Sequence, residues 1–362
     1  MTRISRVHNP MICGAMLIVL ALSALQAFGW QEKISPVSDY QYKKDYAQYE
    51  TIKKEADSQK RAELLVAFMK QHPISRMLTY VAADYLECVK PSIQSKDWPK
   101  VISMEEALLA LMPTEKSVQA AAVPEPGASD FLKNVLPQAL RSVQSALLAA
   151  YYQSNNMPKA AELGEKLYAA APDKSMAAAL ADIYLKMNNA DKFAIYAEKV
   201  VAEVPVEQSF TMVLQLAGIY QQRNDLAKAS EYAAKVMAVY GDKAPQGVQE
   251  SAWNTTRAYA YGVMGLNSYA NKDYPRTLEY YNKVTKCAPK SEEAWYYIGM
   301  AKWRSQDPEG AIAAFAKTVV LNKNLAKKAQ EYLEQLYKAR HNDTLDGLDQ
   351  VLAKAKSELG MS

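Results

Sequence analysis

Few side chains in this sequence of 362 residues are of the types that commonly perform acid–base, nucleophilic or metal chemistry. The only histidines, His8, His72 and His341, stand far apart in the chain. The sequence has no paired-histidine zinc motif, no CxxC pair, no glycine-rich phosphate loop and no GxSxG nucleophile motif. We therefore predict that the protein is not an enzyme and that it binds no metal ion or organic cofactor.

Two pairs of adjacent carboxylates are further candidates for chemistry, Glu105–Glu106 and Glu292–Glu293. Adjacent residues on a helix point in different directions, so neither pair converges on one substrate atom. We predict that all four side chains are solvated at the surface. His72 and His341 are each expected to cap a helix end, where a cation complements the carbonyl dipoles.

The composition indicates a helical protein with a mixed surface. Hydrophobic residues make up 49% of the chain, and no segment shows a convincing two-residue alternation. The formal net charge is +4, and charges of both signs alternate along the predicted helices, as in Lys159, Glu162 and Glu165. Nucleic-acid binding calls for a basic stripe, so we exclude that class of partner.

The last third of the chain contains a repeat of about 34 residues. One copy consists of Tyr261, Gly265, Tyr269, Thr277 and Tyr281, and the next consists of Trp295, Gly299, Trp303, Ala311 and Phe315. Glycine inside a helix is less favourable than alanine by about 1 kcal/mol, so Gly299 predicts a close approach by a neighbouring helix. One helix pair of this length cannot bury its apolar face alone, and several must stack.

This pattern resembles the tetratricopeptide repeat, a two-helix unit of the same length. Asp273-Tyr274-Pro275 and Asp307-Pro308-Glu309 stand where that family turns between its helices. Weaker copies continue upstream through Tyr220, Tyr184 and Tyr151, at spacings of about 36 and about 33 residues. The resemblance implies an all-α fold in which antiparallel helix pairs form a right-handed superhelical solenoid, with about five units over residues 130–324.

One spacing departs from the repeat. The spacing from Ala229 to Thr277 exceeds one repeat by about 14 residues, which corresponds to about four helical turns. An insertion into a solenoid normally lies in a loop or in a lengthened helix. We predict a loop at residues 241–246 and a first helix that is extended from about Gln249.

The remaining segments flank this array. Residues 31–118 are predicted to form an N-terminal helical region with degenerate repeats, and residues 119–129 a linker rich in proline and alanine. The two sides of that linker form either one continuous superhelix or two helical blocks joined by a hinge. Residues 325–362 are predicted to be capping helices, because the last unit of a stack has no neighbour to cover its apolar side.

The N-terminal segment has the pattern of an export signal. Arg3 and Arg6 precede an uncharged apolar run from Met11 to Phe28. At about 18 residues this run is also borderline for a membrane anchor. Residues 1–29 are therefore predicted to be a signal peptide or an anchor, typical of an exported bacterial protein in the periplasm or another extracytoplasmic location. Cys88 and Cys287 are too far apart in a solenoid to form a disulfide.

The resemblance implies a partner-binding groove on the inner face of the first helices. Carried onto this sequence, the binding positions are Tyr152, Gln221, Gln222, Tyr259, Tyr269, Tyr296, Met300, Trp303 and Arg304. The best-known groove of the family clamps a terminal carboxylate with lysines and asparagines, but the matching positions here include Ala149, Asp182 and Gly262. Trp303 has a second interpretation, in which it fills the seam between the last repeat and the cap.

The sequence leaves two function classes open. The first is a non-catalytic scaffold that binds a protein or peptide in this groove, in the cell envelope. The second is a binding protein for a small ligand or glycan that stacks on the aromatic side chains of the groove. Tyrosine suits either role, because its apolar ring carries a polar tip, and the chain has 24 tyrosines but six phenylalanines.

Overall fold

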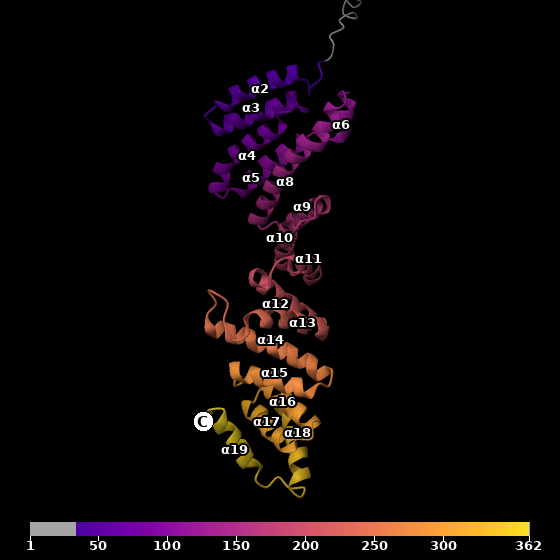
Figure 1. The fold of residues 1–362 in the computed structure, drawn as a ribbon. Coiled ribbons are helices and arrows are strands. Elements are labelled where there is room, and N and C mark those ends of the chain that lie inside the picture. Colours follow the sequence, from indigo (N-terminus) through magenta and orange to yellow (C-terminus); the bar gives the residue numbers. More distant parts are fainter. Residues whose placement is uncertain (1–33, 362) are drawn as a thin grey trace, which may run out of the picture. The chain divides into compact units, whose positions relative to one another are not determined.

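A computed structural model describes residues 34–361, so the predicted signal segment lies outside the described residues. In the described range the chain is all-α, without a strand, as predicted. The chain divides into two compact units, of which the first ends at Ala160 and the second begins at Ala161 (Figure 1). Cys88 and Cys287 are free thiols. No helix within residues 34–361 has both the length and the apolar character needed to cross a membrane.

The first unit packs short helices around one hydrophobic core. Its helices are α2 (Asp39–Lys53), α3 (Ser58–Gln71), α4 (Leu78–Gln94), α5 (Trp98–Ala110), α6 (Glu115–Ala120), α7 (Gly127–Asp130), a π-helical turn η1 (Phe131–Val135) and α8 (Leu136–Gln153). Helix α8 packs against both α4 and α5. The segment predicted as a linker, residues 119–129, lies inside this unit. Val118 before it and Phe131 after it are buried in the same hydrophobic cluster.

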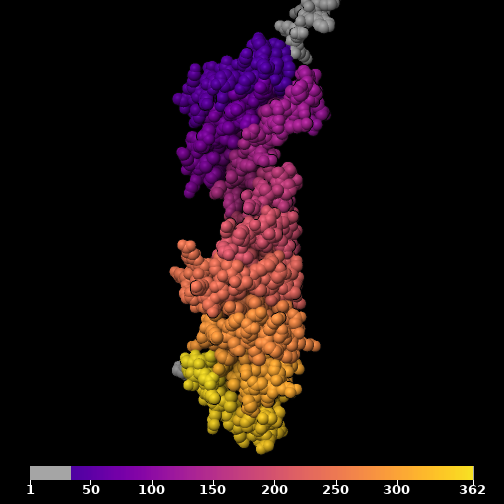
Figure 2. Space-filling model, viewed as in Figure 1, coloured from indigo at the N-terminus to yellow at the C-terminus, as the bar shows by residue number. Residues whose placement is uncertain are grey.

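The second unit begins within α9 (Met157–Ala170) and continues through pairs of antiparallel helices. The pairs are α10 (Lys174–Lys186) with α11 (Ala190–Glu203), α12 (Val206–Gln222) with α13 (Leu226–Tyr240), α14 (Glu250–Ala270) with α15 (Tyr274–Cys287), and α16 (Glu292–Arg304) with α17 (Pro308–Leu321). Each pair also contacts the next, and the colour bands of this unit in Figure 2 follow the chain order. The predicted stacking of helix pairs is therefore confirmed.

The turn inside each of these pairs has the same local cause. A residue with positive φ ends the first helix, and an Asn or Asp then caps the second by accepting a backbone hydrogen bond. In the α14–α15 turn, for example, Lys272 has a φ of 61° and Asp273 accepts from the Arg276 amide at 3.1 Å. The matching caps of α11, α13 and α17 are Asn189, Asp225 and Asp307.

The glycines of the repeat are explained by the packing between helices. A Cβ atom built on Gly299 of α16 would lie 2.7 Å from the Phe315 ring of α17. A Cβ atom on Gly265 of α14 would lie 2.8 Å from the Tyr281 ring of α15. The predicted close approach at Gly299 is therefore confirmed, and the approaching group is an aromatic side chain of the second helix.

The insertion and the cap also occur where the sequence predicts them. The extra residues form a loop after Gly241 and the long helix α14, which begins at Glu250. After α17, helix α18 (Ala326–Arg340) packs on α17, and α19 (Leu348–Glu358) folds back to contact α17 as well. A salt bridge of 2.7 Å between Lys317 and Glu358 ties α19 to α17.

Candidate functional site

The first helices of the last pairs border a small cavity that contains one exposed aromatic ring. We call it the Tyr259 cavity, and its volume is about 220 Å³. Residues of α12, α14, α15 and the start of α16 line it: Gln221, Ala258, Tyr259, Gly262, Val263, Tyr281, Val284, Ser291 and Glu293. Tyr259 is 37% exposed, and its burial on the protein side raises the pKa of its hydroxyl.

Two glycines determine the room around Tyr259. The Tyr259 hydroxyl lies over Gly218 of α12, where a Cβ atom would be 3.4 Å away. At Gly262, one turn after Tyr259, a Cβ atom would have no neighbouring atom within 4 Å. Gly262 therefore differs from Gly265 and Gly299, because no part of the described chain fills the space beside it.

A buried tyrosine and an exposed carboxylate form the polar part of the cavity. Tyr281 is only 1% exposed, and its hydroxyl donates a hydrogen bond of 3.3 Å to the Glu293 carboxylate. Burial, together with the charge of Glu293, raises the pKa of Tyr281 above its ordinary range. The Tyr281 hydroxyl therefore stays protonated at physiological pH and acts as a fixed donor. The ring of Tyr281 is itself held by stacking on Tyr297, with ring centroids 5.1 Å apart.

The predicted binding residues do not all reach this surface. Gln221 and Tyr259 line the cavity, and Gln222 is exposed at the end of α12. Tyr296 and Met300, by contrast, are only 5% and 6% exposed. The Tyr296 ring packs on Phe315 of α17 and Tyr332 of α18, so these two residues belong to the core of the stack. Both were predicted to bind a partner in the groove, but their side chains are buried in the stack and are not exposed in the described chain.

Trp303 and Arg304 lie at the other end of α16, beside Tyr269 of α14. The Trp303 ring packs on Tyr332 of α18 with centroids 5.3 Å apart, which is the seam position of its second interpretation. The Arg304 guanidinium lies 5.1 Å from the centre of the Trp303 ring. Burial raises the pKa of Tyr269, and the charge of Arg304 partly offsets this effect. Tyr152 is half-buried on α8 of the first unit and is not part of this arrangement.

The adjacent carboxylates are not all solvated, contrary to the prediction. Glu292 is buried, and its carboxylate accepts a hydrogen bond of 3.0 Å from the backbone amide of Lys323. Glu105 is 1% exposed, and burial raises its pKa to about 7. Glu106 accepts from the Tyr151 hydroxyl and from Lys159. Sequence reasoning missed these roles, because adjacent residues on one helix meet different neighbours.

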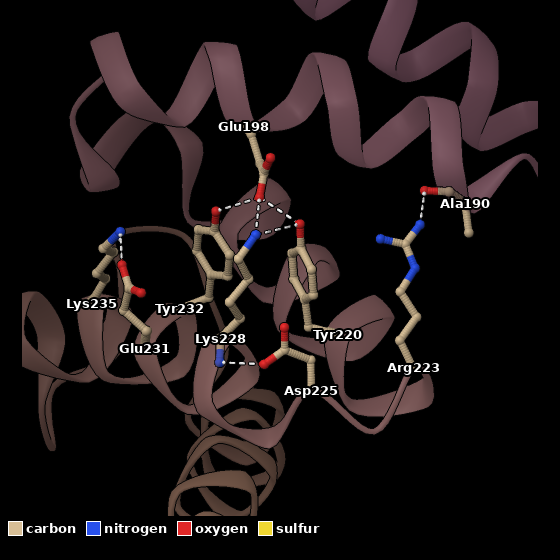
Figure 3. Close-up of polar contacts among 9 residues, drawn as sticks. All are labelled: Ala190, Glu198, Tyr220, Arg223, Asp225, Lys228, Glu231, Tyr232 and Lys235. Atoms are coloured by element: carbon tan, nitrogen blue, oxygen red, sulfur yellow. Dashed lines mark hydrogen bonds and ion pairs between the residues drawn. The ribbon is translucent and has the colours of Figure 1, made fainter.

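A second polar constellation lies between α11 and the pair α12–α13. We call it the Glu198 cluster, which consists of Glu198, Tyr220, Lys228 and Tyr232 (Figure 3). One carboxylate oxygen of Glu198 accepts from the Tyr220 hydroxyl at 2.5 Å, the Tyr232 hydroxyl at 3.1 Å and Lys228 at 3.4 Å. Burial opposes the ionisation of Glu198, but these hydrogen bonds and the lysine charge outweigh it and lower its pKa.

The same arrangement occurs one repeat earlier. Glu165 accepts from the Tyr184 hydroxyl at 2.7 Å, the Tyr196 hydroxyl at 3.2 Å and the Lys192 ammonium. In both clusters the two tyrosine rings are stacked, with centroids 5.8 Å apart. Because donors from two helices converge on one oxygen of each carboxylate, we assign both clusters to the joining of successive helix pairs.

His72 and His341 each follow the end of a helix, as predicted, although their contacts go beyond capping. His72 is the C-cap residue of α3, and its Nδ1 lies 3.4 Å from the buried Asp45 carboxylate. His341 follows α18, stacks on Tyr337, and places Nδ1 2.9 Å from the Tyr337 carbonyl. Neither histidine lines the Tyr259 cavity. Within residues 34–361, no group of three or more His, Cys, Asp or Glu side chains is placed to hold a metal ion.

Comparisons with known proteins report similarity of architecture only. No family model and no curated protein matches the sequence. Among solved structures, the C-terminal part of a TPR repeat-containing protein from Cytophaga hutchinsonii is 18% identical, with a TM-score of 0.38, over 58% of this chain and 78% of that one. The TPR2AB domain of yeast Sti1, in a complex with pHSP90, is 12% identical, with a TM-score of 0.34, over 88% of this chain and 99% of that one.

A tetratricopeptide repeat protein from Parabacteroides merdae is 16% identical, with a TM-score of 0.31, over 82% of this chain and 98% of that one. At these values the similar structures carry no argument about what the chain binds. The repeat fold follows instead from the chain's own repeat spacing, its antiparallel helix pairs and the contacts of Gly265 and Gly299 with aromatic rings.

Proposed function

We propose that this chain, which has the fold of tetratricopeptide-repeat proteins, is a non-catalytic scaffold that binds a protein or peptide on the first-helix face of α12, α14 and α16. The observation that carries the proposal is the Tyr259 cavity. It combines an exposed aromatic ring, fixed polar groups and unfilled space beside Gly262. Exposed aromatic side chains beside pockets are the usual anchors of protein interfaces.

The size of the cavity favours a peptide over a small ligand. Pockets for small molecules usually enclose about 300–1,000 Å³, whereas the Tyr259 cavity encloses about 220 Å³. This volume suits one side chain of a larger partner. The neighbouring hollow along α10 and α12 is larger, about 570 Å³, and its lining includes Lys174, Asp182 and Glu207. Helix α12 borders both, so a partner that extends from one to the other would follow this helix.

A peptide-display experiment tests the proposal while the natural partner is still unidentified. Short random peptides are selected on the purified protein, and the affinity of the selected peptides is then measured for variants. We expect Tyr259→Ala to weaken binding at least about tenfold without lowering the melting temperature. The matched control is Tyr80→Ala, which removes a tyrosine of the first unit that is 59% exposed.

A third variant separates this surface from the seam at the end of α16. Trp303→Ala should lower the melting temperature, because the ring packs on Tyr332. If the selected peptides bind Tyr259→Ala and wild type equally, the Tyr259 cavity is not the binding site. If no peptide is selected that depends on residues of α12, α14 or α16, the proposed function is wrong for this face.

We also propose that the protein acts outside the cytoplasm. The support is the order of charged and apolar residues from Arg3 to Phe28 in the sequence. N-terminal sequencing of the protein from its native source tests this point. A first residue near Phe28 or Trp30, or an intact N-terminus in the membrane fraction, is expected. An intact Met1 on protein from the soluble cytoplasm would contradict it.

A further inference from the structure

The Tyr259 cavity has a defined charge. Glu293 is the charged residue in its lining, and it is exposed in the first turn of α16. The Glu293 carboxylate accepts a hydrogen bond from the uncharged Tyr281 hydroxyl, and no lysine or arginine of residues 34–361 forms an ion pair with it. The lining offers no cation that neutralises the carboxylate. A positively charged group that enters the cavity would therefore meet an unpaired negative charge.

Gly262 supplies the second observation. Glycine inside a helix is less favourable than alanine by about 1 kcal/mol, and at Gly265 and Gly299 an aromatic ring occupies the space of a Cβ atom. No such group exists beside Gly262 among the described residues. The helix therefore keeps open a space that the chain itself does not fill.

The Glu198 cluster shows how this protein binds a cation with the same groups. Lys228 places its ammonium 4.5 Å from the centre of the Tyr220 ring and 3.4 Å from Glu198, while the tyrosine hydroxyl donates to that carboxylate (Figure 3). The Tyr259 cavity contains a tyrosine hydroxyl that donates to a glutamate and a second tyrosine ring, but no lysine. The cavity therefore contains groups of the same kind without a cation among its lining residues.

We propose that the Tyr259 cavity binds one lysine or arginine side chain of the peptide partner, with Glu293 as its counter-ion. The aliphatic stem would pack on Val263, Val284 and the Tyr259 ring, and the charged group would reach the Glu293 carboxylate. Attraction between the cation and the tyrosine ring adds to the ion pair. A volume of 220 Å³ corresponds to about seven water molecules at roughly 30 Å³ each, which is the size of one such side chain.

This inference rests on the proposed function and specifies its partner. The test uses the peptides selected on the purified protein and compares wild type with Glu293→Gln and Glu293→Lys. Glu293→Gln keeps an acceptor for the Tyr281 hydroxyl, so the fold is retained. We expect the selected peptides to contain a lysine or arginine whose replacement by glutamine weakens binding at least about tenfold.

The two changes should not add, because they remove the same ion pair. In Glu293→Gln, a peptide with its basic residue replaced should bind no worse than the unchanged peptide. Glu293→Lys should abolish binding through repulsion. Acetylation of the peptide N-terminus distinguishes a side chain from a terminal amine, and we expect it to have no effect. The matched control is Glu231→Gln, which removes an exposed carboxylate of α13 that pairs with Lys235.

The outcomes separate this inference from the proposal on which it rests. Peptides that need Tyr259 but contain no basic residue, and bind Glu293→Gln as well as wild type, would overturn the inference and leave the binding face in place. Binding that disappears on N-terminal acetylation would also overturn it. A failure to select any peptide that depends on Tyr259 would overturn both.

Discussion

Two parts of the second unit solve the same packing problem differently. In α14–α17 a glycine of the first helix faces an aromatic ring of the second, Gly265 with Tyr281 and Gly299 with Phe315. At the corresponding positions of α12–α13 the chain has Ala217 and Ala233, both fully buried. Two small side chains meet in α12–α13 where a glycine and an aromatic ring meet in α14–α17, and both arrangements let the two helices pack closely.

The two parts also differ in whether their buried and half-buried polar groups pair within the chain. Around α10–α13 the clusters of Glu165 and Glu198 satisfy their carboxylates with donors from the chain itself. In the α14–α16 region, Ser268 and Arg276 stand at the positions of Tyr220 and Lys228 in the repeat, and no such cluster forms there. The polar groups of Tyr281 and Glu293 are instead left at an open cavity. We propose on this basis that the first part provides cohesion and the second part provides a surface for recognition.

The largest effect is expected where an aromatic ring fills the seam. Phe315 is fully buried against Gly299, so Phe315→Ala leaves a cavity that a glycine cannot fill. We expect a loss of about 3–5 kcal/mol in the free energy of unfolding, measured by denaturant titration. Gly299→Leu overpacks the same contact and should cost about 1–3 kcal/mol. A denaturation midpoint that is unchanged in Gly299→Leu would show that the seam is loose.

Glu105 differs from Glu165 and Glu198, because one of its carboxyl oxygens is buried without a hydrogen-bond donor in the described chain. Oε2 of Glu105 is buried and has no hydrogen-bond partner among the described residues. Burial raises the pKa of Glu105 to about 7 in the folded protein, whereas an ordinary glutamate has a pKa near 4.5. The Glu105 carboxyl group therefore stays protonated in the folded protein up to a pH of about 7. The contribution of protonated Glu105 to the free energy of unfolding is therefore fully present below about pH 4.5, and it is lost as the pH rises through 7.

Glu105→Gln should remove this decrease in stability with rising pH, because glutamine carries no titratable group. We expect the variant to be more stable than wild type at pH 8, by up to about 3 kcal/mol, because each pKa unit corresponds to roughly 1.4 kcal/mol. The advantage should shrink toward pH 4, which melting curves at several pH values would show. An advantage that is equal at pH 4 and pH 8 would mean that the Glu105 carboxyl does not titrate in this range.

A smaller effect of opposite sign is expected at Glu198. Its pKa lies below the ordinary glutamate value in the folded protein, so its ionised form stabilises the fold above about pH 4.5, and this contribution is lost as the pH falls. Because the side chain is 36% exposed, Glu198→Gln should cost only about 1 kcal/mol at pH 7. The difference should vanish in acid. Glu231→Gln breaks an exposed pair and should cost at most a few tenths of a kcal/mol.

The sequence was sufficient to predict the repeat and the insertion, because both depend on spacing, and the cap, because the last unit of a stack needs a cover for its apolar side. Gly299 predicted a close helix approach, since a helical glycine needs a reason, and the loop before α14 followed from a spacing that was longer than one repeat. The site was only partly predictable. Tyr259 and Gln221, two of the predicted groove residues, line the candidate cavity, but Tyr296 points into the seam, because its direction depends on where α17 and α18 lie.

Glu293 was not recognised as a member of the candidate site, and Gly262 was noted only as a groove position without the clamp residue of the family. The sequence did contain a signal for Gly262, a second helical glycine shortly before Gly265, the one that the repeat requires. Only the positions of the neighbouring helices show that nothing in the described chain fills the space beside it.

The central claim is that the cavity beside Gly262 receives part of a partner, and one variant tests it most directly. In Gly262→Leu the new side chain extends into the Tyr259 cavity, while the helix gains up to about 1 kcal/mol in propensity. The measurement is the affinity of the selected peptides, with the melting temperature as the control for folding. We predict a melting temperature equal to or above that of wild type and a loss of peptide binding. Peptide binding at wild-type affinity by folded Gly262→Leu would contradict the claim.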